Sequence, residues 1–254
     1  MTTKTLPLVP TIPSADVEAL AADYDRDGVV RLRQLLRPEE LPRIREELAR
    51  YTREVLPKLP AGDYVIERDG KSPRVLLRME QHDPFFRDFP ARPDLLALVA
   101  RLVHGEPVVA GVESFCKPAR IGAAVPPHQD NAYFCQKPPD MLTVWIAIDP
   151  ATEANGPITH ILGSHRHGVL PHRASGVAGN SMVLAEARPF RPAEQFVGLL
   201  EPGDALIHHC QTIHYSAPNT SAQSRWGLLV VVRGAHTQLD PVLRAAYDKV
   251  RAGT

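Results

Sequence analysis

Proline is the residue that most limits how this chain can fold. There are 25 prolines among 254 residues, about twice the average usage of roughly 5%, and they are spread along the whole sequence. A proline inside a helix removes a hydrogen bond and clashes with the preceding turn, so helices stay short where prolines recur. The sequence therefore disfavours a long-helix bundle and favours many short elements joined by turns.

From Pro107 onward, short runs rich in β-branched residues alternate with turn clusters. These runs predict strands over 108–115, 141–149, 196–200, 204–209 and 226–232. No helical pattern of 10–15 residues separates them, which argues against parallel βαβ units. We therefore expect a mainly β fold with flanking helices, built on an antiparallel double-sheet barrel or jelly roll.

The region before Pro107 has a different pattern. Apolar residues at helical spacing predict helices over 15–26, 37–55 and 92–103, and an apolar run predicts a strand over 29–36. The segment 57–73 is polar and rich in turn residues, so it is expected to be a surface loop, with a lid extending to residue 80. We expect these N-terminal helices to pack on one sheet of the barrel.

The chain is predicted to form a single domain over residues 1–254. Its expected parts are a helical and lid region over 1–106, the jelly-roll core over 107–235 and a C-terminal helix over 236–254. An alternative division into two domains is less favoured, because the N-terminal helices are too amphipathic to fold alone.

Charge and cysteine content exclude several functional classes. The chain has 29 Lys and Arg residues against 29 Asp and Glu residues, so it lacks the basic surplus of a nucleic-acid-binding or polybasic membrane-surface protein. No stretch approaches the 18 apolar residues of a membrane helix. Three cysteines without a C-x-x-C motif indicate a reducing compartment. We expect a cytoplasmic protein, and the sequence predicts no particular oligomeric state.

The residues most indicative of chemistry are histidines and carboxylates near predicted strand ends. On an extended segment, His128 and Asp130 face the same side, and His214 lies far downstream. Two histidines and one carboxylate on one face of a metal form the triad of non-haem Fe(II) oxygenases, which leaves three positions open. The alternative for a His-x-Asp triplet is a turn residue with a hydrogen-bonded neighbour, and in a chain with 11 histidines the triplet alone is a weak motif.

An arginine near the last of these histidines strengthens this interpretation. Arg225 follows His214 by eleven positions, on the next apolar run. A buried arginine needs an anion, and its planar guanidinium suits a carboxylate. Ser216 lies two residues past His214, where its hydroxyl is able to reach the same carboxylate. The alternative for Arg225 is a structural salt bridge.

Several segments together resemble one enzyme family. P-P-H-Q-D (126–130), T-V-W-I-A-I-D (143–149), E-A-N-G-P-I-T-H-I-L-G-S-H (153–165) and the stretch 202–225, which begins P-G-D-A-L-I-H-H, are similar to the phytanoyl-CoA dioxygenase family of Fe(II)- and 2-oxoglutarate-dependent oxygenases. The resemblance covers roughly residues 108–233. It implies a double-stranded β-helix with a cupin-like core that uses Fe(II), 2-oxoglutarate and O2.

The resemblance also implies roles for individual residues. His128, Asp130 and His214 would be the iron ligands, and Arg225 and Ser216 would hold the distal carboxylate of 2-oxoglutarate. Further candidates for the co-substrate pocket are Trp145, Thr143 two residues before it, and Arg78 in V-L-L-R-M-E-Q. Candidates for substrate binding follow the first ligand, with ordinary barrel packing as their alternative: Gln129, Asn131, Tyr133, Phe134 and Gln136.

The remaining histidines are weaker candidates. A zinc site formed by His208, His209 and Cys210 is a poor one, because adjacent strand residues point to opposite faces. Four further histidines in the loop-rich middle are expected to be solvated or to cap turns: His160, His165, His167 and His172.

The resemblance implies hydroxylation of an unactivated C–H bond in a small molecule, with release of succinate and CO2. Related halogenases replace the iron-binding carboxylate with a small residue, so the presence of Asp130 argues for hydroxylation over halogenation. Desaturation, epimerisation and ring formation stay open, and the substrate is expected to be a natural-product or amino-acid-like compound. Two alternatives are a Zn- or Mn-dependent isomerase or hydrolase on the same barrel and a non-catalytic binding module.

Overall fold

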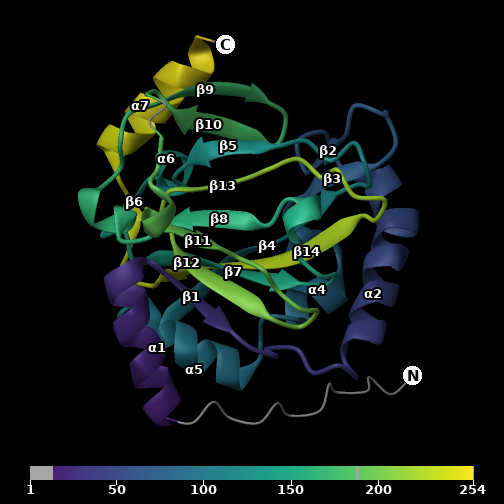
Figure 1. The fold of residues 1–254 in the computed structure, drawn as a ribbon, viewed down its shortest axis with the longest axis horizontal. Helices are drawn as coiled ribbons and strands as arrows, with labels where there is room; N and C mark the ends of the chain where they lie inside the picture. The colour runs from purple at the N-terminus through teal and green to yellow at the C-terminus, as the bar shows by residue number, and fades with distance from the viewer. Residues whose placement is uncertain (1–13, 187–188, 254) are drawn as a thin grey trace.

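Two antiparallel sheets face each other in the computed structural model, which describes residues 14–186 and 189–253 (Figure 1). The α-helices are α1 (Ser14–Asp27), α2 (Leu41–Arg50), α3 (Met79–His82), α4 (Pro84–Asp88), α5 (Pro93–Leu102), α6 (Asn131–Phe134) and α7 (Pro241–Ala252). The strands are β1 (Val29–Leu32), β2 (Tyr64–Ile66), β3 (Pro73–Leu76), β4 (Pro107–Lys117), β5 (Val125–His128), β6 (Gln136–Lys137), β7 (Met141–Ala147), β8 (Ile158–Ile161), β9 (His172–Val177), β10 (Asn180–Leu184), β11 (Gln195–Val197), β12 (Ala205–His209), β13 (His214–Ser216), β14 (Arg225–Gly234) and β15 (Gln238–Leu239).

The strand order is that of a double-stranded β-helix. The larger sheet has seven strands in the order β1-β12-β7-β14-β4-β3-β2, and the smaller has four in the order β11-β8-β13-β5. Neighbouring strands pair antiparallel in both sheets, as in the pairs β14–β4 and β13–β5. Two further pairs, β9–β10 and β6–β15, lie beside these sheets. The predicted jelly-roll core is confirmed.

Strand β7 shows how the layers are held together, because all seven of its residues are buried. Val144 and Ile146 belong to the large apolar cluster that also includes Ile44 of α2 and Leu98 of α5. Alternate residues, such as Trp145, pack instead in a cluster between the two sheets. A strand buried on both faces lies between two apolar layers. The prediction that N-terminal helices cover one sheet is confirmed, and α1, α2 and α5 lie along the large sheet in Figure 1.

The segment predicted as a surface loop contains an ordered hairpin. Strands β2 and β3 pair antiparallel within residues 64–76, and β3 pairs in turn with β4 at the edge of the large sheet. The polar turn between them, Asp69–Ser72, hid the two short strands from the sequence pattern. The carboxylate of Asp69 accepts hydrogen bonds from the backbone of Lys71 and Ser72, which closes that turn.

Other boundaries differ from the prediction for local reasons. The strand predicted over 29–36 ends at Leu32, since Gln34 has a left-handed backbone (φ 49°) and donates its N–H to the carboxylate of Asp204. The helix predicted to reach Val55 is α-helical only to Arg50 and continues as a π-helical turn. The middle of the chain, expected to be rich in loops, contains β8, β9 and β10.

No helix among the described residues has the length and apolarity needed to cross a membrane. Cys116, Cys135 and Cys210 are all buried and unpaired.

Candidate metal centre and co-substrate pocket

Two histidines face each other across adjacent strands of the small sheet. His128 ends β5 and His214 begins β13, and they are directly opposite partners in the antiparallel register. Their ring centroids lie 4.2 Å apart, and both side chains are buried. Directly opposite residues present their side chains on the same face of a sheet. The strand pairing therefore brings together two imidazoles from distant parts of the chain.

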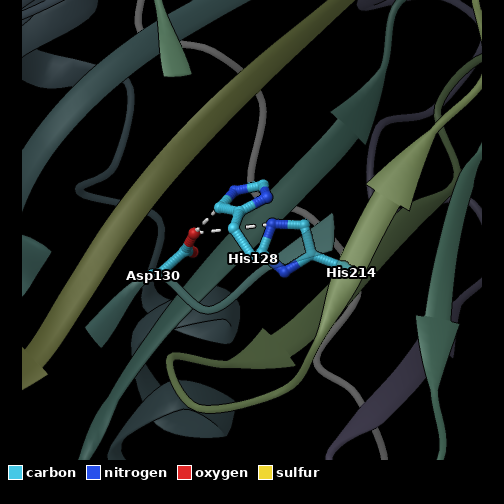
Figure 2. A group of neighbouring side chains, drawn as sticks. All are labelled: His128, Asp130 and His214. Carbon is cyan, nitrogen blue, oxygen red and sulfur yellow. Dashed lines mark ion pairs between the residues drawn. The ribbon is translucent and has the colours of Figure 1, made fainter. Parts of the chain in front are cut away.

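Asp130 completes the group through a turn. We expected an extended His128–Asp130 segment, and this was wrong: β5 ends at His128, and Asp130 has helical backbone angles (φ −60°, ψ −36°) at the start of α6. The turn directs the carboxylate toward the end of the strand, where Oδ1 lies 3.5 Å from Nε2 of His128 and 3.4 Å from Nε2 of His214 (Figure 2). The predicted convergence of the three side chains is confirmed.

Backbone carbonyls determine which nitrogen of each histidine faces the centre. Nδ1 of His128 lies 2.9 Å from the carbonyl oxygen of Pro126, and Nδ1 of His214 lies 3.0 Å from that of Thr212. A carbonyl only accepts hydrogen bonds, so each Nδ1 donates, and Nε2 is the nitrogen left to face the centre. Both histidines are thereby oriented as metal ligands before any cation binds.

The protonation states suit a cation as well. Burial lowers the pKa of His214 to about 3, so the ring is neutral at pH 7. Burial alone would raise the pKa of Asp130, but the neighbouring imidazoles, chiefly His214, hold it well below its usual value. Two histidines and one carboxylate are the ligand set of non-haem Fe(II) oxygenases. In the described part of the chain, no other group of three or more His, Cys, Asp or Glu side chains brings its ligand atoms within 4.8 Å of one another.

Two more histidines lie beside the triad, and sequence reasoning missed their position. His208 on β12 is buried, and its Nε2 lies 3.3 Å from Oδ2 of Asp130. His160 on β8 is opposite His214 in the register, with ring centroids 5.7 Å apart. The expectation that His160 is solvated or caps a turn was wrong, because β8 is a central strand of the small sheet and His160 is fully buried. Alternate residues of each strand face the interior, and this alternation was the signal from which the burial of His160 and His208 could have been predicted.

The candidate zinc site at His208, His209 and Cys210 is not formed. His209 points to the opposite face from His208, where its ring packs near Tyr24 of α1 at 6.0 Å between centroids. The thiol of Cys210 lies 3.2 Å from the carbonyl oxygen of Pro139. Adjacent residues on β12 therefore point to opposite faces of the sheet and pack in different layers.

Two buried cations lie opposite each other at the inner end of the pocket. Arg225 starts β14 and is directly opposite Lys117, the last residue of β4. Nη1 of Arg225 donates to the carbonyl oxygen of Gly156 at 2.8 Å, and its Nε is buried without a hydrogen-bond partner among the described residues. Nζ of Lys117 donates to the carbonyls of Ala123 and Ala217, at 2.8 and 2.5 Å.

Two buried, positively charged side chains next to each other are unfavourable unless an anion neutralises them. Burial and the nearby Arg225 lower the pKa of Lys117 to about 7, and burial lowers the pKa of Arg225 to about 10. Two like charges in low dielectric favour a bound anion between or beside them. The orphaned Nε of Arg225 and the pair of cations fit a carboxylate of 2-oxoglutarate. Ser216, predicted to contact the same carboxylate, lines this cavity and is buried. Lys117 was not predicted, because only the strand register places it opposite Arg225.

Trp145 lies beneath the guanidinium of Arg225. The guanidinium carbon is 5.0 Å from the centre of the Trp145 ring, within the range of a cation–π contact. Gly227 makes room for this ring, since a Cβ there would lie 2.2 Å from a ring carbon of Trp145. Thr143, two residues earlier, lies nearer the metal ligands, with its hydroxyl 3.3 Å from Oδ2 of Asp130.

One cavity of about 580 Å³ connects these groups. It contains the triad, the co-substrate candidates Arg225, Ser216, Trp145 and Thr143, and two of the predicted substrate residues, Tyr133 and Phe134. Residues from the β2–β3 hairpin, the β9–β10 turn and α7 complete its wall; they include Arg74, Gly179, Tyr247 and Arg251. The C-terminal helix is therefore part of the pocket.

Three predicted substrate residues are used for local structure. The Gln129 amide donates to the carbonyls of Gly168 and Gln211 and is fully buried. The side-chain amide of Asn131 donates to the backbone carbonyl of Gln136 and accepts a hydrogen bond from the backbone N–H of Gln136. None of the three lines the cavity. Because the chain turns at this point, some residues next to the metal ligands point into the core and others into the pocket. Closeness in sequence to a metal ligand was therefore a poor guide to which residues line the pocket.

Arg78 lines the outer part of the cavity and is half-exposed. Its guanidinium pairs with the carboxylate of Asp63 and donates to the carbonyl of Gly62. It has a left-handed backbone (φ 52°) immediately before α3. The structure places Arg78 at the rim rather than beside Arg225.

Comparison with known proteins agrees with this geometry. A family model described as phytanoyl-CoA dioxygenase matches residues 24–227. The chain is 30% identical over 148 residues to phytanoyl-CoA dioxygenase of Arabidopsis thaliana, a match that covers 58% of this chain and 52% of that protein. It is 28% identical over 240 residues to L-proline trans-4-hydroxylase of Streptomyces griseoviridis, covering 86% and 87%. The chain thus spans about half the length of the plant protein and most of the bacterial one.

Solved structures share the fold. A non-haem monooxygenase, ThoJ in its apo form, superimposes with a TM-score of 0.73 and 25% identity over 87% of this chain and 79% of that one. EctD from S. alaskensis, with 2-oxoglutarate and 5-hydroxyectoine, has a TM-score of 0.72 at 18% identity, over 93% and 81%. At that identity the second likeness shows the fold alone.

A double-stranded β-helix that holds a His-x-Asp…His triad in the same cavity as a buried arginine defines the non-haem iron and 2-oxoglutarate-dependent oxygenases. Within that class, the chain belongs to the phytanoyl-CoA dioxygenase family.

Proposed function

We propose that this protein is an Fe(II)- and 2-oxoglutarate-dependent hydroxylase of a small natural-product or amino-acid-like molecule, acting as a single catalytic domain. The observation that supports this most strongly is the buried pair Arg225 and Lys117 in the same cavity as the triad. When bound, iron and 2-oxoglutarate supply the oxidising power, and succinate and CO2 are released. The protein positions the reactants and excludes water.

Each group of residues has a distinct part in this proposal. His128, Asp130 and His214 hold the cation through preset Nε2 and Oδ1 atoms. Arg225, Ser216 and Lys117 bind the distal carboxylate of the co-substrate, and Trp145 supports the guanidinium from below. Tyr133 and Phe134 form part of the substrate wall.

The choice of a free small molecule is supported by the pocket and by one relative. The similar protein that this chain covers over most of its length is named L-proline trans-4-hydroxylase. The cavity of about 580 Å³ suits a compact substrate together with 2-oxoglutarate. The three unpaired cysteines support a reducing, cytoplasmic location, and a role in biosynthesis follows from such a substrate.

The alternative of a zinc- or manganese-dependent isomerase or hydrolase uses the same triad but gives no role to Arg225 and Lys117. Anaerobic addition of Fe(II) and 2-oxoglutarate distinguishes the candidates, because a weak metal-to-ligand charge-transfer band in the visible is expected for the oxygenase only. The His214→Ala variant should lose the band, and in the presence of O2 the wild type should form succinate. Absence of the band in metal-loaded wild-type protein would overturn the proposal.

The reaction outcome has its own test. Because the carboxylate of Asp130 is present, the product formed in the presence of excess chloride should carry a hydroxyl group and no chlorine. Mass spectrometry of the product separates hydroxylation from desaturation, since the two change the mass by a gain of oxygen or a loss of two hydrogens. A chlorinated product would contradict the proposal.

A further inference from the structure

Glu113 lies on the cavity-facing side of strand β4. Phe115, Cys116 and Lys117 of that strand also line the cavity, and Glu113 shares one face of the strand with Phe115 and Lys117, which follow at alternate positions. In the register of the large sheet, Glu113 is opposite Leu229, which is in turn opposite Trp145. Glu113 is therefore in one inward-facing row with residues that build the active-site pocket.

Glu113 differs in its contacts from the other charged groups around the outer cavity. No described residue makes a hydrogen bond or ion pair with it, although the other charged groups around the outer cavity are paired. Arg74 binds Glu67 at 3.2 Å, and Arg78 binds Asp63. Glu80 accepts a hydrogen bond from the backbone N–H of Val112 at 2.8 Å.

The surroundings of Glu113 disfavour a bare negative charge. Burial, Asp130 and Glu80 together raise the pKa of Glu113 to about 8, although Arg78 opposes them. Glu113 is partly buried and faces the cavity, where its charged form has no counter-ion among the described residues. The missing partner is a cation or a strong donor that enters from the cavity.

Aromatic rings border the same space. Tyr133 and Phe134 of α6 and Tyr247 of α7 line the same cavity as Glu113. The rings of Tyr133 and Phe134 meet edge to face, 4.7 Å apart. A carboxylate beside aromatic rings is the usual environment for a substituted ammonium group, because the ring faces attract the cation while the carboxylate accepts its N–H bonds.

We propose that Glu113 recognises a positively charged nitrogen of the substrate, so that the enzyme acts on an amine or imino compound; this assignment rests on the proposed function. The pocket is then polarised along β4. Lys117 marks the anionic co-substrate end, and Glu113, four residues away and about 13 Å along the strand, marks the cationic substrate end. Acyl-CoA compounds, whose head group is strongly anionic, are disfavoured at this end.

The test uses pairs of probes of similar size that differ in one positive charge, together with the full-length, Fe(II)-loaded protein and 2-oxoglutarate. Each pair contains an amine and its carbon or oxygen analogue: L-proline with cyclopentanecarboxylate, piperidine with tetrahydropyran, and L-lysine with 6-hydroxynorleucine, which replaces the terminal amine by a hydroxyl. Succinate formation above the probe-free rate is measured for each compound, and the ratio of amine to analogue is the readout. The charge-transfer band is recorded in parallel, so that loading with iron and 2-oxoglutarate is known for every protein.

In the wild type, at least one amine should stimulate succinate formation about tenfold or more over its analogue, in keeping with a charge-assisted hydrogen bond. The ratio should fall close to one in Glu113→Gln and should be largely kept in Glu113→Asp, which preserves the charge. Glu106→Gln, an exposed position just before the same strand, is the matched control and should keep the wild-type ratio.

Three results would overturn the assignment. They are equal stimulation by amines and analogues in the wild type, no stimulation by any amine, and an unchanged ratio in Glu113→Gln that shows the band. If Glu113→Gln loses the band, Glu113→Asp decides, since a ratio near one in that loaded variant also contradicts the assignment. Absence of the band from the wild type would instead refute the proposed function, so the two failures are distinguishable.

Discussion

Nε2 of His208 lies 3.3 Å from Oδ2 of Asp130, while the two ligand histidines face Oδ1 of the same carboxylate. Oδ2 is therefore held by a side chain outside the triad, while Oδ1 faces both ligand histidines and also accepts a hydrogen bond from the hydroxyl of Tyr133 at 2.5 Å. Thr143 also contacts Oδ2, with its hydroxyl at 3.3 Å. Hydrogen bonds of this kind orient a ligand carboxylate and tune its basicity.

Replacement of His208 should therefore weaken metal binding. We expect His208→Ala to raise the dissociation constant for Fe(II) about 10- to 100-fold, because Asp130 loses the partner that orients it. Anaerobic competition with a chelator measures the change. His209→Ala is the control, since its side chain faces away from the centre toward α1, and an equal loss in both variants would contradict a specific role for His208.

Arg225 should dominate binding of 2-oxoglutarate. Arg225→Ala leaves Lys117 as the sole cation opposite the co-substrate carboxylate, and removal of a buried charge partner costs on the order of 3–5 kcal/mol. We expect the affinity for 2-oxoglutarate, followed by the charge-transfer band, to fall at least 100-fold. Arg233→Ala, at the other end of β14, should change it less than twofold. A similar loss in Arg233→Ala would indicate damage to the strand instead.

The depressed pKa of Lys117 makes co-substrate binding pH-dependent. Burial, with help from Arg225 and Arg74, lowers this pKa to about 7, so Lys117 is largely neutral at pH 8.5 without an anion nearby. A bound carboxylate favours the protonated form, and binding should therefore take up a proton at pH 8.5. Calorimetry in buffers of different ionisation enthalpy measures that uptake, and Lys117→Met should abolish it. Equal uptake in the variant would refute the role of Lys117.

The same shift predicts how stability varies with pH. The unfolded chain holds the Lys117 proton up to about pH 10.4, whereas the folded protein without co-substrate releases it near pH 7. Between these values the unfolded state binds more protons, so the contribution of Lys117 to the free energy of unfolding rises as the pH increases from 7 to 10. Comparison of denaturation curves of the wild type and Lys117→Met over this range isolates that contribution, which should be absent from the variant. A difference that does not vary with pH would contradict it.

Gly227 should be intolerant of a side chain. A Cβ at this position would lie 2.2 Å from the Trp145 ring, so Gly227→Ala must displace the ring that supports Arg225. We expect a loss of about 1–3 kcal/mol in the free energy of unfolding together with weaker binding of 2-oxoglutarate. Gly111→Ala on the facing strand is the control, because its added Cβ meets nothing within 4 Å. Matching losses in the two variants would point to strand propensity as the cause.

The parts of the site that the sequence predicts are those fixed by chain order. The His-x-Asp…His motif identifies His128, Asp130 and His214 from their order in the chain. Their convergence is confirmed. The route of convergence could not be found in that way, since the helical turn at Asp130 depends on local backbone geometry at the end of β5.

The parts that escaped prediction depend on the register of the sheets. Lys117 becomes meaningful only opposite Arg225, and Glu113 only in the row of Leu229 and Trp145. A shift of one residue in either strand would turn these side chains to the helical layer. The sequence does show polar residues at alternate positions of an otherwise apolar strand. The pattern alone does not tell whether these residues face the cavity or the opposite side of the sheet.

The direct cross-strand pairing of His128 and His214 has a consequence for the molecule as a whole. A cation shared by these two imidazoles would link β5 and β13 directly, although the two strands lie far apart in the sequence. Ligands that bind only the folded state raise its stability by mass action. Bound iron is thus expected to raise the stability of the folded protein, in addition to supplying its chemistry.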